Sequence, residues 1–263
     1  MTQNLPVKSP VNVLKGIVNS EAMQAQFKNA LKDKSSLFAA SLIDLYTSDT
    51  YLQNCEPKAV IMEALKAATL NLPINKNLGY SWIVPYKNNG KLEPNFQIGY
   101  KGYRQLAIRT GEYKHINVDC VYEGEIVEKD RISGNIIISG AKTSDKAIGY
   151  FGYFKTLNGY EKSIHWSKEE IIIHAKKYSK SYGNKYSAWS TDFDKMALKT
   201  ISIELLSKWG ILSIEMSKAF ESDNDDMSFN KHEQEAAIEA NSEVIDTKPL
   251  NTNKKDKVIK PDF

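Results

Sequence analysis

The sequence predicts an α+β protein in which helices flank an antiparallel β-sheet that carries a β-hairpin. Apolar residues recur at helical spacing over residues 20–70, and again between residues 167 and 208. Between these regions, residues 80–166 form short aromatic and β-branched runs that Gly, Asn or Asp interrupts. Short strands with such punctuation favour antiparallel pairing over alternating β-α-β units.

The amino-terminal part is expected to contain three helices. In EAMQAQFKNAL the apolar residues share one face, and Ser20 can cap the first amides. The run SSLFAASLIDLY repeats this pattern, with Leu37, Leu42 and Leu45 on the expected inner face. Pro57 suits the first turn of a third helix, PKAVIMEALKAATL, because its φ is fixed and its missing amide would have no partner there.

Residues 80–100 are expected to form the hairpin, because aromatic stems surround the connecting sequence NNG. The next segment, KGYRQLAIRTG, has helical spacing. That spacing places Tyr103 and Leu106 on an inward face and leaves Lys101 and Arg104 on the outward face. A basic helix surface is therefore predicted directly after the hairpin.

Short strands are expected in KHINVDCVYEGEIVEKD, SGNIIISG, KAIGYFGYFKTLNGY and EKSIHWS, which turn residues separate. Ser167 and Glu170 have the spacing of a capping box, so a helix is expected to begin there. A second long helix is predicted from Ala188 to about Lys208.

Charge divides the chain more clearly than the total of +3 indicates. Residues 221–246 hold nine acidic residues against one basic residue and have a net charge of −8, whereas residues 247–263 carry +3. Residues 1–220 therefore carry +8. We predict a flexible arm over residues 1–19, a folded and basic domain over residues 20–220, and a largely disordered tail, acidic and then basic, over residues 221–263.

Basic and aromatic side chains alternate in a further segment, KKYSKSYGNKYSAW, which contains no acidic residue. Lysines bind phosphates and aromatic faces stack on exposed bases, so this composition favours single-stranded nucleic acid. Solvated helix faces and a lysine-rich loop would give the same pattern without a ligand. An RNA-binding module or a purely structural oligomer also stays open, because composition does not distinguish these classes.

Enzymatic and metal-binding classes have weaker support. The carboxylates of VYEGEIVEKD (Glu123, Glu125, Glu128 and Asp130) would suit a metal-dependent nuclease, but no second carboxylate cluster accompanies them. The cysteines and histidines lack metal-binding spacing, and the sequence GxxxxGK[ST] of nucleotide-binding loops is absent. No apolar run approaches membrane-spanning length. We therefore expect no catalytic or metal-ligating residue, and no membrane partner.

Three segments resemble the RecT family of phage single-strand annealing proteins: residues 64–86, 96–125 and 187–200. Their sequences are ALKAATLNLPINKNLGYSWIVPY, FQIGYKGYRQLAIRTGEYKHINVDCVYEGE and SAWSTDFDKMALKT. The chain departs from the family pattern at Ala188, where a proline is usual, and at Thr110, where the family has Ser.

The resemblance implies an ATP-independent protein that coats single-stranded DNA as a ring or helical filament and anneals complementary strands through a duplex intermediate. It also implies a phage or prophage protein acting in the bacterial cytoplasm, with a partner exonuclease, and a host single-strand binding protein as a further candidate partner of the tail. No cofactor is required, and modulation by Mg²⁺ stays open. The candidate DNA-binding residues are Lys87, Phe96, Gln97, Tyr100, Lys101, Arg104, Arg109, Lys176, Lys177, Lys180, Lys185, Lys195 and Lys199.

Overall fold

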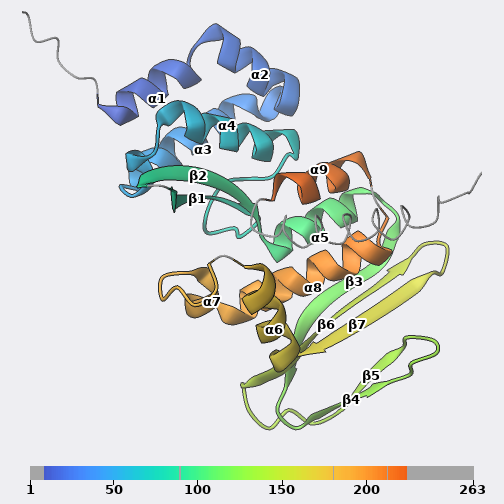
Figure 1. The fold of residues 1–263 in the computed structure, drawn as a ribbon. Helices are drawn as coiled ribbons and strands as arrows, with labels where there is room; N and C mark the ends of the chain where they lie inside the picture. The colour runs from blue at the N-terminus through green and yellow to red at the C-terminus, as the bar shows by residue number, and fades with distance from the viewer. Residues whose placement is uncertain (1–8, 89, 180, 212, 224–263) are drawn as a thin grey trace, which may run out of the picture. The chain divides into compact units, whose positions relative to one another are not determined.

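The computed structural model describes residues 9–88, 90–179, 181–211 and 213–223. Within these residues the predicted α+β class is confirmed, and Figure 1 shows the helices and the small antiparallel sheets. None of the described helices is long and apolar enough to cross a membrane. Both cysteines are free, and burial raises the pKa of the Cys120 thiol to about 11.

The amino-terminal helices pack around one apolar core. They are α1 (Pro10–Val18), α2 (Glu21–Leu31), α3 (Ser35–Ser48) and α4 (Pro57–Thr69), with short 3-10 turns at Lys32–Lys34 and Leu52–Asn54. The predicted helix starts are confirmed, because Ser20 accepts the Met23 amide and Pro57 is the first residue of α4. Leu37 was expected to face inward but is 72% exposed. Phe38 takes its place in the core.

Helix α1 corrects the expectation of a flexible arm for residues 10–18. Ser9 caps this helix, and Pro10 occupies its first turn. Leu14 and Val18 are fully buried against the other amino-terminal helices. The two positions lie four residues apart and therefore share one helix face. Two apolar positions are too few to stand out in a search for helical periodicity over a longer window.

The hairpin forms as predicted from β1 (Ser81–Asn88) and β2 (Lys91–Ile98). Its register pairs Asn88 with Lys91, and Gly90 has a φ of +84°, which suits the tight connection. Helix α4 holds the hairpin on one side, since Glu63 accepts the Phe96 amide at 2.8 Å. Helix α5 (Tyr100–Arg109) follows directly and buries Tyr103, Leu106 and Ala107, as the sequence predicts.

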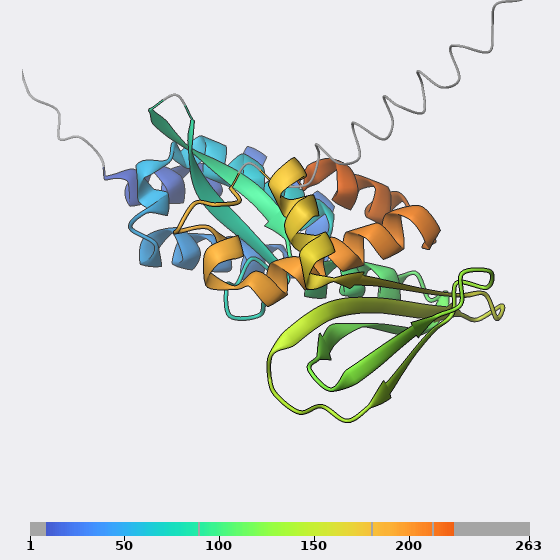
Figure 2. The same cartoon turned by 60° about the horizontal axis from the view of Figure 1, so that its bottom comes forward.

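A three-stranded antiparallel sheet forms next, in the order β3-β6-β7. Its strands are β3 (Tyr113–Tyr122), β6 (Ala147–Thr156) and β7 (Glu161–Ser167), whereas β4 (Glu125–Lys129) and β5 (Ile136–Gly140) form a separate two-stranded ribbon. Figure 2 shows this ribbon beside the larger sheet. Helix α8 contacts all three strands of the larger sheet, and Gly152 lets it approach closely because a Cβ there would lie 2.9 Å from Ile201.

The carboxy-terminal helices are α6 (Lys168–Tyr178), α7 (Ala188–Thr191), α8 (Phe193–Trp209) and α9 (Ile214–Ser222). The capping box of Ser167 and Glu170 is present. The predicted helix from Ala188 breaks at Asp192, whose φ of −143° and ψ of 53° are not helical. Three residues that favour caps over helix interiors, Ser190, Thr191 and Asp192, explain the break.

Candidate nucleic-acid interface

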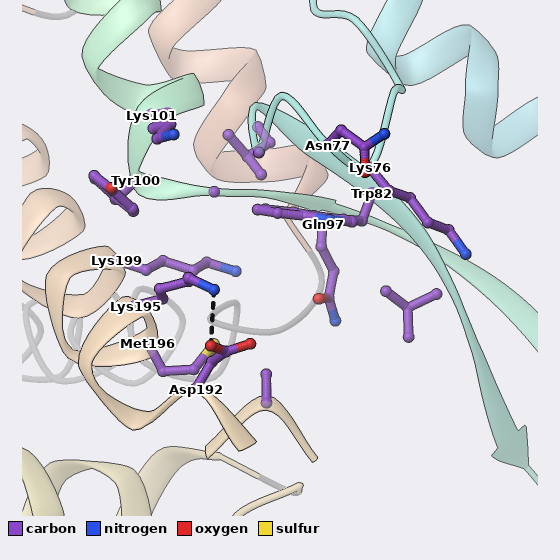
Figure 3. Close-up of a pocket in the computed structure, with 15 residues that line it drawn as sticks. Lys76, Asn77, Trp82, Gln97, Tyr100, Lys101, Asp192, Lys195, Met196 and Lys199 are labelled. Atoms are coloured by element: carbon purple, nitrogen blue, oxygen red, sulfur yellow. Dashed lines mark hydrogen bonds and ion pairs between the residues drawn. The ribbon is translucent and has the colours of Figure 1, made fainter. Parts of the chain in front are cut away.

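A cavity of about 540 Å³ lies between the base of the hairpin and the beginning of α8. It brings together β1, β2, the first residues of α5, and the α7–α8 junction, which are distant in sequence. Figure 3 shows Trp82 and Gln97 on one side of this space and Lys195, Met196 and Lys199 on the other. We call it the hairpin pocket.

Gly99 allows the indole ring of Trp82 to lie against the backbone in the pocket wall, and a Cβ on Gly79 would meet the ring at ordinary contact distance. A Cβ built on Gly99 would lie 2.4 Å from the ring, and one on Gly79 would lie 3.7 Å from it. The first distance is too short for any side chain, so Gly99 is required for this placement of the ring. Trp82 remains partly exposed, which leaves apolar aromatic surface in the pocket.

Four lysines line the pocket, and three of them form ion pairs. Lys76 pairs with Asp49, Lys195 pairs with Asp192 at 2.7 Å, and Lys199 pairs with Asp223 at 3.0 Å. The fourth, Lys101, is exposed and has no ion-pair partner within the described residues. The pocket therefore combines aromatic surface with cations that a phosphate can approach.

The Lys76 pair fixes the loop that leads into β1. Burial raises the pKa of the Asp49 carboxyl, but hydrogen bonds from Lys76 and from the amides of Leu52 and Tyr51 outweigh it and hold the pKa below its ordinary value. Asp49 is thus held as a carboxylate, and it keeps Lys76 at the edge of the hairpin pocket.

The start of α5 adds a second source of positive potential. Gly99 is the N-cap residue and has no side chain that could accept the first amides. The N-terminus of a helix carries a partial positive charge, which favours anions. Gly99, Tyr100 and Lys101 all line the pocket, so this helix end lies at its wall.

Five predicted DNA-binding residues meet in this pocket: Gln97, Tyr100, Lys101, Lys195 and Lys199. Gln97 is oriented by a hydrogen bond that its amide donates to the Tyr86 hydroxyl at 2.6 Å. Lys199 is only 4% exposed and bonds both carboxylate oxygens of Asp223, so a phosphate would have to replace that carboxylate. Lys87 and Arg104 are exposed but do not line the pocket.

The structure gives two predicted contact residues other roles. Phe96 is fully buried in the core beneath the hairpin, so the prediction that its ring contacts DNA is wrong. Arg109 donates to the carbonyls of Leu70 and Asn71 at 2.8 and 2.7 Å, and burial lowers the pKa of its guanidinium. It therefore joins the end of α5 to the end of α4.

The second basic cluster lies at the end of α6 and in the loop after it. Lys176 and Lys177 are exposed in the last turn of α6, where the helix dipole stabilises positive charge. Lys185 lies over the ring of Tyr186, which is 82% exposed. Lys180 lies outside the described residues. Lys176, Lys177 and Lys185 do not line the hairpin pocket.

Sequence reasoning did not select Lys76, Trp82 or Met196, all of which line the pocket. From the sequence, Lys76 lies between the third predicted helix and the predicted hairpin, and Trp82 lies in a stem of that hairpin. The glycine pair around the ring, at residues 79 and 99, was the available signal, because glycines on both sides of an aromatic stem indicate a close approach of the backbone.

Two of the carboxylates that suggested a nuclease, Glu123 and Asp130, have structural partners. Glu123 accepts hydrogen bonds from Lys146 at 2.6 Å and Ser144 at 2.9 Å, which lower its pKa. Asp130 accepts from Ser133 and Ile132 in the β4–β5 connection. Over the described part of the chain, no group of three His, Cys, Asp or Glu residues is placed to hold a metal ion.

Comparison with known proteins adds independent information. The profile described as "RecT family" matches residues 36–240. The chain is 43% identical over 262 residues to "Uncharacterized protein YqaK" of Bacillus subtilis (strain 168), covering 98% of this chain and 87% of the relative. It is 24% identical over 216 residues to "Protein RecT" of Escherichia coli (strain K12), covering 78% of each chain.

Proposed function

Because the chain belongs to the RecT family, we propose that it binds single-stranded DNA and anneals complementary strands in homologous recombination, without ATP. The observation that best supports this proposal is the hairpin pocket, where a partly exposed indole and four lysines meet. Proteins that bind single strands combine such aromatic platforms with cations that follow the phosphates.

In this proposal, a base stacks on Trp82 while adjacent phosphates contact Lys101 and Lys195. The apolar side chain of Met196 borders the same space. Neither the stacking contact nor the phosphate contacts read base edges, so binding is independent of sequence and leaves those edges available for pairing. Annealing makes and breaks no covalent bond. The chain therefore needs no catalytic residue and no required cofactor for this activity, and Mg²⁺ would act only by screening phosphates.

Several subunits would multiply these contacts along one strand. Each pocket binds weakly on its own, but linked sites act at high effective concentration. We propose a ring or filament of this chain as the active form, with the exposed cations Lys87, Arg104, Lys176, Lys177 and Lys185 following the strand outside the pocket. A strand-producing exonuclease is the proposed partner, and residues 224–263 are its proposed docking segment.

The deciding experiment is annealing of two complementary fluorescent oligonucleotides, added one after the other without any nucleotide. We expect faster pairing than in protein-free buffer, intact strands, and no pairing of a noncomplementary control. Binding without faster pairing would reduce the function to that of a binding module, and shortened strands would revive the nuclease hypothesis. An RNA oligonucleotide of the same sequence tests whether the site requires DNA.

A further inference from the structure

Lys199 is the buried member of the pocket's lysines, and its counter-ion comes from the end of α9. Its ammonium bonds both oxygens of the Asp223 carboxylate, at 3.0 and 3.2 Å, and the two side chains are 5% and 1% exposed. The pocket's other ion pairs, Lys76–Asp49 and Lys195–Asp192, are more exposed. Asp223 itself does not line the pocket.

Asp223 also anchors α9 to the elements that build the pocket. Its Oδ2 accepts from the Ile98 amide at 3.2 Å and from the Tyr103 hydroxyl at 2.9 Å. Its own amide donates to Ala219 at the end of α9. One turn earlier, Phe220 stacks on Tyr103 at a centroid distance of 5.3 Å. The end of α9 is thus attached to β2, α5 and α8 through one carboxylate.

We propose that Asp223 is a positioning residue that couples occupancy of the hairpin pocket to the attachment of α9. A phosphate entering the pocket draws the Lys199 ammonium away from Asp223, and the end of α9 loosens in return. This inference rests on the proposed function, because it takes the phosphates of single-stranded DNA as the ligand. It adds a reciprocal link between the pocket and the helix that immediately precedes residues 224–263.

The hydrogen bonds make this replacement physically reasonable. When the ammonium leaves, the Asp223 carboxylate keeps two donors, the Ile98 amide and the Tyr103 hydroxyl. These two donors lower the cost of leaving the buried carboxylate without its cation. Lys199 already lines the pocket, so its flexible side chain needs a local rearrangement and no movement of α8.

The coupling predicts that a single variant and a double variant change the affinity for oligo(dT) in opposite directions. Asp223→Asn keeps the size of the side chain and removes its charge, so Lys199 becomes more available and oligo(dT) binds several-fold more tightly. Combining it with Lys199→Met removes both charges together and leaves no buried ion without a partner. This double variant should bind more weakly than the wild type, with a salt slope lower by about 0.7 for the one lost phosphate contact.

The test combines fluorescence anisotropy on oligo(dT) over a salt series with hydrogen exchange at the α9 amides. In the wild type, oligo(dT) should speed exchange at residues 214–223 several-fold, and in the double variant it should leave the rate unchanged. The matched control, Asp192→Asn with Lys195→Met, removes the more exposed pair of the same pocket. It should also lower the salt slope but keep the response of α9.

The outcomes separate this inference from the proposed function. A wild type that does not bind oligo(dT) contradicts both. Two results together would overturn the coupling and leave the annealing function intact. In the first, the wild type binds and anneals but oligo(dT) does not change hydrogen exchange in α9. In the second, the salt slope of the double variant equals that of the wild type. Circular dichroism and thermal melting establish that each variant is folded before it is compared. Should Asp223→Asn alone fail to fold, the double variant still decides the question.

Discussion

Replacing Gly99 with Ala is expected to displace the Trp82 ring and weaken binding of single-stranded DNA. The new Cβ would lie 2.4 and 2.6 Å from two ring atoms and 2.7 Å from the Gly79 carbonyl oxygen. Ordinary contacts begin near 3.4 Å, so the ring must retreat by about 1 Å. The carbonyl belongs to the backbone and cannot move aside as the end of a flexible side chain can.

The size of the effect follows from the role proposed for the ring. Stacking of a base on an aromatic side chain contributes about 1–3 kcal/mol, which corresponds to roughly 5- to 150-fold in affinity. Loss of the platform should therefore weaken oligo(dT) binding within this range. Overpacking at Gly99 should also lower the stability of the fold by about 1–3 kcal/mol. The salt slope should not change, because no cation is removed.

The assay is fluorescence anisotropy on oligo(dT) at several salt concentrations, with Trp82→Ala measured in parallel. The matched control is Gly16→Ala in α1, where a new Cβ meets nothing within 4 Å. This control should be neutral or slightly stabilising, because Ala favours helices more than Gly does. If Trp82→Ala bound oligo(dT) within twofold of the wild type, the stacking platform would be refuted and the ring would be only a wall of the pocket.

Three further predictions concern single groups. Lys101→Ala and Arg104→Ala should each lower the salt slope by about 0.7, which the same anisotropy series measures, and an unchanged slope would remove that residue from the interface. Arg109→Gln should lower the free energy of unfolding by about 1–3 kcal/mol, because it leaves two carbonyls poorly satisfied; denaturant melts test this, and a changed salt slope would instead indicate a phosphate contact. Burial lowers the pKa of His165 in spite of the opposing charge of Glu170, so this group contributes stability above its unfolded pKa of about 6.5 that is lost as pH falls through the folded value. Between pH 7 and 5, the melting temperature of His165→Gln should fall less with decreasing pH than that of the wild type. The same fall in both proteins would contradict this reasoning.

Local patterns predicted most of the elements correctly because each depends on nearby residues. The hairpin register follows from its turn, and the buried face of α5 follows from helical spacing. The prediction that Leu37 faces inward was wrong, because spacing defines a helix face but not the neighbour that covers each position on it. The break at Asp192 depends on three consecutive cap-forming residues, which a search for apolar periodicity overlooks.

The candidate site was harder to predict, because its members come from segments distant in sequence. The sequence indicates that Lys101 and Lys195 are cations near aromatic residues, but not that they face one cavity. Counting charge assigned Asp223 to an acidic tail, whereas the structure buries it against Lys199. For Phe96 the sequence predicted a DNA contact, whereas the structure buries the ring. A hairpin with one buried face also places aromatic residues beside basic ones, so this pattern alone does not indicate a ligand.

The ion pairs of the pocket bear on how such a protein could release what it binds. Three of the four pocket lysines already have a carboxylate partner, so a phosphate gains only the difference between two ionic contacts. Two of these pairs, Lys76–Asp49 and Lys195–Asp192, are the more exposed ones. Exposed ion pairs contribute about 0–1 kcal/mol, so exchanging either carboxylate for a phosphate changes the free energy little in either direction. A pocket of unpaired cations would hold the strand more tightly and would oppose transfer to its complement. Under the proposed function, local acids therefore favour contacts that are weak singly and cumulative along a strand, which is the behaviour that pairing by trial requires.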